Sequence, residues 1–118
     1  MKGKRPLHII FFRSELGSEP VRNWLQEMSK SDRKTIGSDI LAVQYAWPVG
    51  KSLVANVGSG IWEIRSKLSS TIARTIFCLV DEEIVLLHGF IKKTKTTPKR
   101  ELDLAKRRKR QYLKNDKK

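Results

Sequence analysis

The sequence is poor in the residues that build cross-links and metal centres. It has one cysteine, Cys78, and two histidines, His8 and His88, among 118 residues. A single cysteine can form no internal disulfide, so we expect Cys78 to be a small buried apolar residue. Clustered carboxylates, a Ser-His-Asp arrangement and a glycine-rich phosphate loop are also missing from the sequence. These absences favour a protein that needs neither a metal ion nor a cofactor.

Long apolar runs are absent as well. No run approaches the roughly 20 apolar residues that cross a bilayer, and the apolar stretch 7–12 is too short for a signal peptide. We therefore expect a cytoplasmic protein with no membrane contact. Its length predicts a single domain over residues 1–118, with residues 115–118 as a frayed tail.

Acidic residues are few compared with basic ones. Twelve Asp and Glu face 25 Lys and Arg, and the formal net charge is +13. Thirteen of the basic residues lie in the segment 92–118, which carries +10 of that charge. So uneven a distribution indicates a polyanionic partner at one end of the protein, and phosphate backbones are the commonest such partner.

Hydrophobic periodicity predicts the elements. Residues 7–12 are expected to form an interior strand, and residues 49–60, which show no period, a loop. Two amphipathic helices are expected between them, the first capped by Ser18 and the second capped by Ser31 and ended by Trp47-Pro48. Gly37 in the second helix is expected where the two helices pack closely. Strands at 61–65, 72–80 and 83–91 form an antiparallel meander, and Thr97 caps a final helix that opens with Pro98.

Two arginines on neighbouring strands are the first candidates for a site. Strand alternation places Arg65 on the face opposite Trp62. An arginine at position 74, in the middle of the next strand, is costly unless it meets solvent or an anion. Arg65 and Arg74 could therefore converge on a phosphate, which guanidinium groups bind with two parallel hydrogen bonds. The alternative is that Arg65 pairs with Glu63 or Asp81 and that Arg74 points to solvent.

A lysine cluster follows the third strand of the meander. Lys92, Lys93 and Lys95 lie between that strand and a helix N-terminus, where free N–H groups also favour anions. One of these amines could accept a proton; the alternative is a merely solvated basic segment. His88, in mid-strand, is expected to be a structural hydrogen-bonding residue.

Several motifs together resemble the HigB-type toxins of the RelE/ParE superfamily, in particular their phage-derived members. They are PVRNWL at 20–25, WEIR at 62–65, AR at 73–74 and LLHGFIKKTKTTP at 86–98. The resemblance implies an α+β fold of order βααβββα. It implies a twisted antiparallel sheet, two N-terminal helices packed on one face, and a basic C-terminal helix.

The resemblance also implies a function. HigB-type toxins are metal-independent endoribonucleases that cut mRNA in the ribosomal A site, and a helix-turn-helix HigA-type antitoxin holds them in check. The catalytic residues would be Arg65, Arg74, Lys92, Lys93 and Lys95. The RNA contacts would be Phe90, by stacking on a base, and Lys99, Arg100, Arg107 and Arg108. Two alternatives stay open: a non-catalytic ParE-like inhibitor of DNA gyrase, and a plain basic RNA- or DNA-binding module.

Overall fold

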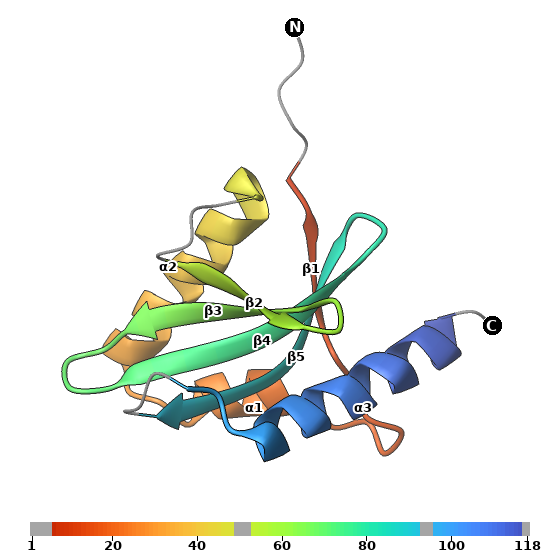
Figure 1. Ribbon diagram of the computed structural model, residues 1–118. Helices are drawn as coiled ribbons and strands as arrows, with labels where there is room; N and C mark the ends of the chain where they lie inside the picture. The colour runs from red at the N-terminus through yellow and green to blue at the C-terminus, as the bar shows by residue number, and fades with distance from the viewer. Residues whose placement is uncertain (1–5, 49–52, 93–95, 117–118) are drawn as a thin grey trace, which may run out of the picture.

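Five strands form one sheet with helices on both faces, in a computed structural model that describes residues 6–48, 53–92 and 96–116 (Figure 1). In chain order the elements are β1 (His8–Phe11), α1 (Pro20–Gln26), α2 (Lys30–Ala46), β2 (Val54–Gly58), β3 (Ile61–Lys67), β4 (Ile72–Val80), β5 (Glu83–Lys92) and α3 (Lys99–Asp116). Helices α1 and α2 cover one face, and the basic helix α3 covers the other. The expected α+β fold is confirmed. Within the described ranges no helix is long and apolar enough to cross a membrane.

The sheet has the strand order β1-β5-β4-β3-β2. The expected meander is confirmed, because β3, β4 and β5 pair in antiparallel fashion. Strand β1 is parallel to β5 and lies at an edge, so the expectation of an interior strand was wrong. Its run is apolar because Ile9 and Phe11 face one core while Ile10 and Phe12 face the other. Apolar residues on both faces of a strand indicate that helices cover both faces of the sheet there. They do not indicate that the strand has a neighbouring strand on each side.

Strand β2 lies where a loop was expected, which is a second correction. It pairs in antiparallel fashion with β3 at the other edge of the sheet, with an irregular register between Asn56 and Gly58. The strand is five residues long, and it is held by backbone pairing to β3 more than by an apolar pattern of its own. The segment was not predicted as a strand because it contains a glycine and an asparagine, two residues that are rare in strands.

Two hydrophobic cores lie on the two faces of the sheet. The core under α1 and α2 includes Val21, Ile40, Ile64 and Phe77. The core under α3 includes Ile61, Ile76, Leu87 and Ala105. Strand β3 was expected to be half-buried, but Ile61 and Ile64 are both fully buried although they face opposite ways. Ile61 is buried because α3 covers the second face of the strand.

The helix starts differ from those expected. The residue before α1 is Glu19, which makes no side-chain cap, and Ser18 instead accepts a hydrogen bond from Asn23 at 3.3 Å. Helix α2 is capped by Ser29, whose hydroxyl accepts the amide of Asp32 at 3.1 Å. Ser31 already lies inside that helix. Several Ser residues close together made the capping residue ambiguous in the sequence. Helix α3 includes residues 115 and 116, and residues 117–118 of the expected tail lie outside the described residues.

Glycine has a packing role on β5 rather than in α2. A Cβ at Gly37 would meet no described atom within 4 Å, so close helix packing does not explain this glycine. A Cβ at Gly89 would lie 2.2 Å from Cε3 of Trp24. The indole of α1 therefore rests directly on the β5 backbone, and this contact seats α1 on the sheet.

Candidate active site

Three rows of side chains cross β3, β4 and β5 on the face that α3 covers. The rows are Glu63–Ile76–His88, Arg65–Arg74–Phe90 and Lys67–Ile72–Lys92. Because alternate residues of a strand share a face, Arg65 and Arg74 lie side by side on the same face, and Lys92 lies one row away. Three of the expected site residues are thus brought onto one surface. The other two, Lys93 and Lys95, lie outside the described residues.

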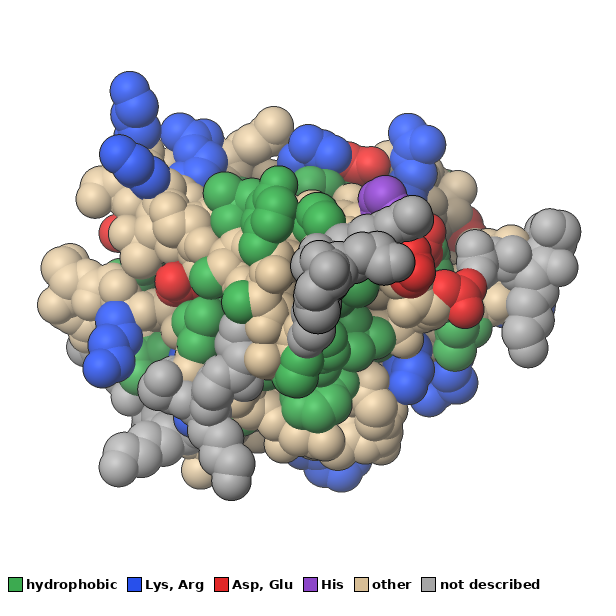
Figure 2. Space-filling view, turned by 90° about the horizontal axis from the view of Figure 1, so that it is seen from above, with side chains coloured by type: hydrophobic (Ala, Val, Ile, Leu, Met, Phe, Trp, Pro, Cys, Tyr) green, Lys and Arg blue, Asp and Glu red, His purple; other side chains and the backbone are tan. Residues whose placement is uncertain are grey.

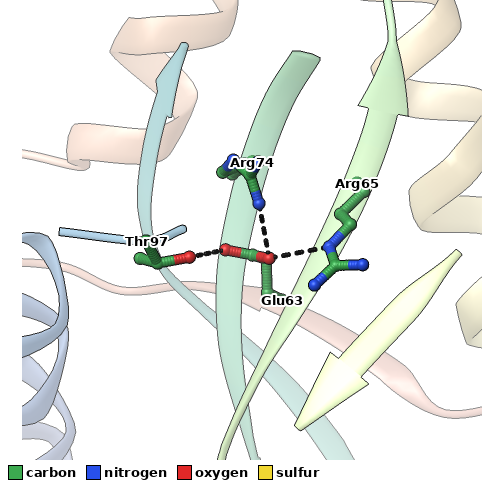
Figure 3. Close-up of polar contacts among 4 residues, drawn as sticks. All are labelled: Glu63, Arg65, Arg74 and Thr97. Atoms are coloured by element: carbon green, nitrogen blue, oxygen red, sulfur yellow. Dashed lines mark hydrogen bonds and ion pairs between the residues drawn. The ribbon is translucent and has the colours of Figure 1, made fainter. Parts of the chain in front are cut away.

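A buried carboxylate joins the two arginines (Figure 3). Oε1 of Glu63 accepts hydrogen bonds from Nη1 of Arg74 at 2.8 Å and from Nε of Arg65 at 3.0 Å. The Glu63 side chain is fully buried. A buried charge is tolerated when it is paired and hydrogen-bonded, and this arrangement pairs one anion with two cations. The three groups together keep one net positive charge.

The two arginines differ in their access to solvent. The Arg74 side chain is 1% exposed, whereas that of Arg65 is 39% exposed. The sequence also allowed Arg65 to pair with an acidic residue while Arg74 points to solvent. Arg65 does pair with Glu63, but Arg74 does not point to solvent. Glu63 engages Arg65 at Nε, and one terminal nitrogen of that guanidinium points away from the carboxylate (Figure 3). A solvent-facing anion could bind there.

Thr97 completes the cluster from outside the sheet. Its hydroxyl donates a hydrogen bond to Oε2 of Glu63 (Figure 3). We expected Thr97 to cap α3, but the helix begins at Lys99, and the carbonyl of Pro98 accepts the first amides. The threonine is thus used to fasten the start of α3 to the buried carboxylate.

His88 ties β5 to α3. Its Nε2 lies 2.5 Å from Oε1 of Glu101, and its Nδ1 lies 3.4 Å from Nη1 of Arg108. The pKa of His88 lies below its ordinary value, because burial, the largest influence, and the nearby Arg108 lower it against the contact with Glu101, which raises it. A neutral ring that donates from Nε2 and accepts at Nδ1 satisfies both contacts. This geometry agrees with the structural role that the sequence indicated.

Phe90 belongs to the core beneath the site. Its side chain is 8% exposed. The ring stacks on His88 with centroids 5.5 Å apart and an angle of 26° between the planes. Because this face of the ring is already covered, stacking of a substrate base on Phe90 would need a rearrangement. The core role, which the sequence left open beside base stacking, fits this packing.

The expected RNA contacts on α3 fall into two groups. Arg108 is partly buried and donates to the carbonyl of Leu87 at 2.8 Å, so it holds the helix to the sheet. Burial lowers the pKa of Arg108. Arg100 and Arg107 are exposed, and so is Lys99, which donates to Asp103 at 2.8 Å. The exposed members can meet a phosphate backbone without disturbing the fold.

Two hollows lie beside Trp47 and Pro48, at the C-terminal end of α2. One, of 560 Å³, is lined by Trp47, Pro48, Val54, Ala55, Asn56, Trp62 and Arg65. The other, of 350 Å³, is lined by Pro6, Leu7, Gln44, Tyr45, Trp47, Pro48 and Glu82. Figure 2 views the molecule from this end, and hydrophobic side chains occupy the middle of the face while Lys and Arg stand mostly around it. The first hollow contains a candidate catalytic residue, Arg65.

Sequence reasoning missed three residues of the cluster. Glu63 was considered only as a partner of Arg65, and Thr97 only as a helix cap. Lys67, exposed and in the same row as Lys92, was not considered at all. The period of two along β3 was the available signal, since it places residues 63, 65 and 67 on one face. Within the described residues no group of three His, Cys, Asp or Glu side chains could hold a metal ion.

An arginine-bearing sheet face under a basic C-terminal helix, in this α+β arrangement, defines a small RelE-like protein. The free double arginine-to-alanine mutant of the E. coli toxin RelE matches with a TM-score of 0.59 at 13% identity, covering 88% of this chain and 98% of that chain. The fold of the RelE/ParE superfamily, which the motifs indicated, is confirmed. The family model described as phage-derived protein Gp49-like (DUF891) matches residues 23–110, and the chain belongs to this family. No curated protein matches the sequence.

Proposed function

We propose that this protein is the toxin of a type II toxin–antitoxin system, a metal-independent endoribonuclease that cleaves mRNA on the ribosome. The Gp49-like family and the RelE fold support the toxin assignment. The observation that carries the enzymatic proposal is the state of Arg65. Its Nε is held by a buried carboxylate while 39% of its side chain is exposed to solvent. Donors fixed in advance are what a reaction that builds up negative charge requires.

The proposed reaction uses the ribose as its own nucleophile. The 2′-oxygen bonds to phosphorus while the bond from phosphorus to the 5′-oxygen breaks. A base takes the proton of the 2′-hydroxyl, and the departing 5′-oxygen receives a proton. The products are a 2′,3′-cyclic phosphate and a 5′-hydroxyl end. DNA lacks the 2′-hydroxyl, so RNA is the substrate.

The basic residues take the following roles in the proposed reaction. Arg65 binds the non-bridging oxygens of the scissile phosphate through its terminal nitrogens. Arg74, closed to solvent, acts through Glu63 by holding that carboxylate in place. Lys92, with Lys93 and Lys95, positions the RNA and exchanges the two protons. Lys67 adds a further cation at the same surface.

The proposed partners are mRNA in the ribosomal A site and a helix-turn-helix antitoxin of the HigA type. The exposed residues of α3, including Arg100 and Arg107, contact phosphates of mRNA or ribosome. For the antitoxin, two apolar side chains on α2 are candidates. Leu41 is 53% exposed and Tyr45, one helical turn later, is 63% exposed. Both lie on α2, which covers the face opposite to that of Arg65.

The decisive experiment is induction of the protein in bacteria without its antitoxin, followed by mapping of mRNA 5′ ends. We expect growth arrest with new 5′-hydroxyl ends inside coding regions, in phase with codons. Arg65→Ala should abolish both effects. Arg33→Ala is the matched control, because Arg33 is an exposed arginine of α2 outside the proposed site.

The outcomes separate the functions. Intact transcripts together with stalled replication would contradict the nuclease and support inhibition of gyrase. Growth arrest that survives Arg65→Ala but is lost when charges of the run 106–110 are removed would support a plain nucleic-acid-binding module. Its affinity would then fall steeply with salt concentration.

A further inference from the structure

A hollow on the α3 side of the sheet is lined by basic side chains. It has a volume of 300 Å³ and lies between the turn that joins β2 to β3 and residues 106–113 of α3. Its described lining holds three cations and no acid, and consists of Ser59, Lys106, Lys109, Arg110 and Leu113. A concave surface with charges of one sign concentrates ions of the other sign. The hollow is therefore suited to an anion.

Lys109 is held in a fixed position in this hollow. Its Nζ donates a hydrogen bond to the carbonyl oxygen of Ser59 at 2.9 Å. The same nitrogen lies against Gly60, where a Cβ atom would be only 2.6 Å away. Gly60 has a φ of +71°, so a glycine at this position permits both the left-handed turn and the close approach of the amine. Because an ammonium group has three donors, the amine can bind a ligand without leaving Ser59.

The cations of the hollow are poorly neutralised. In the part of the chain that the structure describes, neither Lys109 nor Arg110 makes an ion pair with a carboxylate. Lys106 is within electrostatic range of Asp103, which lies one turn earlier on α3. Lys106 and Arg110 are four residues apart, so they are neighbours on the helix surface and repel each other. An anion bound between them would remove this repulsion.

The hollow opens on the same side of the sheet as the proposed phosphate site. Ile61, the first residue of β3, belongs to the core under α3. Alternate residues of a strand share a face, so Arg65 lies on that side too. Gly60 and Arg65 are five residues apart in the chain, which corresponds to about 17 Å along an extended strand. One strand of RNA can follow this face from one position to the other.

We infer that the hollow binds a second phosphate of the same RNA strand whose scissile phosphate lies at Arg65. Lys109 contacts this phosphate, and Lys106 and Arg110 flank it. The inference rests on the proposed function and adds to it a site that positions the substrate, since phosphate contacts fix the register of a nucleic acid on a protein. The shared face favours RNA over an acidic protein as the ligand, because one strand supplies phosphates to both places.

Two variants separate a built site from general positive charge. Lys109→Ala removes the amine. Gly60→Asn keeps the net charge and tolerates the left-handed backbone, but its Cβ atom would displace the amine from Ser59. The probe is a single-stranded 2′-O-methyl oligonucleotide of about 12 nucleotides, which cannot be cleaved because its 2′-hydroxyl groups are blocked. Binding is followed by fluorescence anisotropy.

Both variants should bind this oligonucleotide about tenfold more weakly than the unchanged protein, as expected for the loss of one charge-assisted hydrogen bond. Lys109→Ala should also reduce the slope of log affinity against log salt by about 0.7, the value for one phosphate contact of a single strand. Lys34→Ala is the matched control, because it removes an exposed lysine of α2, and it should bind normally. Thermal unfolding of each variant checks that the fold is kept.

Stoichiometry shows whether one strand occupies both positions. Calorimetry should give one oligonucleotide per protein, and Arg65→Ala and Lys109→Ala should each weaken this single binding event. Two oligonucleotides per protein, one lost with each variant, would overturn the shared strand. Normal binding by Gly60→Asn beside weak binding by Lys109→Ala would show that only net charge matters and would overturn the built site.

Failure of this inference and failure of the proposed function look different. If the protein cuts mRNA in cells while Lys109→Ala and Gly60→Asn bind RNA normally, the second phosphate site is wrong and the nuclease stands. If both variants bind RNA weakly but expression of the unchanged protein leaves transcripts intact, the site stands and the nuclease is wrong. Failure of the unchanged protein to bind the oligonucleotide would overturn both.

Discussion

Arg74 and Glu63 form an ion pair from which solvent is excluded. Nη1 of the arginine lies 2.8 Å from Oε1 of the glutamate, with 1% and 0% of the two side chains exposed. Both residues lie on the same face of the sheet as α3, and Thr97, just before that helix, bonds to the same carboxylate. In this arrangement Arg74 supports the site from within, while Arg65 is the arginine that can contact a ligand.

The ion pair predicts strong thermodynamic coupling. Glu63→Gln and Arg74→Gln should each lower the free energy of unfolding by about 3–5 kcal/mol, because each leaves the opposite charge buried without its main partner. The double variant should lose clearly less than the sum of the two. Urea denaturation of the four proteins measures the coupling energy. Strictly additive losses would contradict the pairing.

Arg65→Lys tests whether the planar guanidinium matters beyond its charge. A lysine cannot be held at one nitrogen while it presents two others to a phosphate. We expect single-turnover cleavage to fall about 10²–10³-fold, the usual effect of removing a transition-state donor. Stability should change by less than about 1 kcal/mol, because the side chain is 39% exposed. Full activity of the lysine variant would show that charge alone suffices.

Replacement by alanine should have opposite effects on stability at Gly89 and at Gly37, because the two glycines have different surroundings. Gly89→Ala should destabilise the protein by about 1–3 kcal/mol, since the new methyl group would overlap the Trp24 ring. Gly37→Ala should stabilise it by about 0.5–1 kcal/mol, because the position is helical and has room for the methyl group. Chemical denaturation of both variants checks the pair. Equal effects would contradict the described seating of α1.

His88 predicts a loss of stability on mild acidification. Burial lowers its pKa below the ordinary value of 6.5, so below that pH the unfolded chain binds a proton that the folded protein does not yet bind. Stability therefore decreases as the pH falls through 6.5 towards the lowered pKa. His88→Gln should flatten this decrease in unfolding free energies measured between pH 7.5 and pH 5.5. His8→Gln, at an exposed position, serves as the control.

Cys78 predicts protection from alkylation in the folded state. Its side chain is fully buried, and burial raises the pKa of the thiol from 9.0 to about 11, against a smaller lowering by Lys109. At pH 8 iodoacetamide should therefore react about as fast as the protein opens, and at the rate of a free thiol in urea. Rapid labelling of the folded protein would contradict the described core.

The elements with strong local patterns were the ones that the sequence predicted well. The meander of β3, β4 and β5 follows from alternation and short turns, which are properties of neighbouring residues. Strand β2 was missed because it depends on pairing with a strand that comes later in the chain. The start of α2 was misplaced because Ser29 and Ser31 can each serve as a cap, and the cap of α1 was misplaced because that position holds Glu19, which makes no side-chain cap.

The candidate site divides in the same way. That Arg65 and Arg74 share a face follows from a period of two and from antiparallel register, and the sequence was sufficient for it. The burial of Arg74 was not predictable, since the residues around position 74 do not show that its charge pairs with Glu63 of the neighbouring strand. The second role of Thr97 depends on the same contact across the sheet.

The bond between Thr97 and Glu63 has a consequence for how the protein matures. All five strands precede α3 in the chain, so during synthesis the sheet leaves the ribosome before its cover exists. Until the last helix docks, water reaches the acid and both guanidinium groups, and nothing fastens the carboxylate from above. A nascent chain of this protein thus acquires its working surface late, as one of the final events of folding.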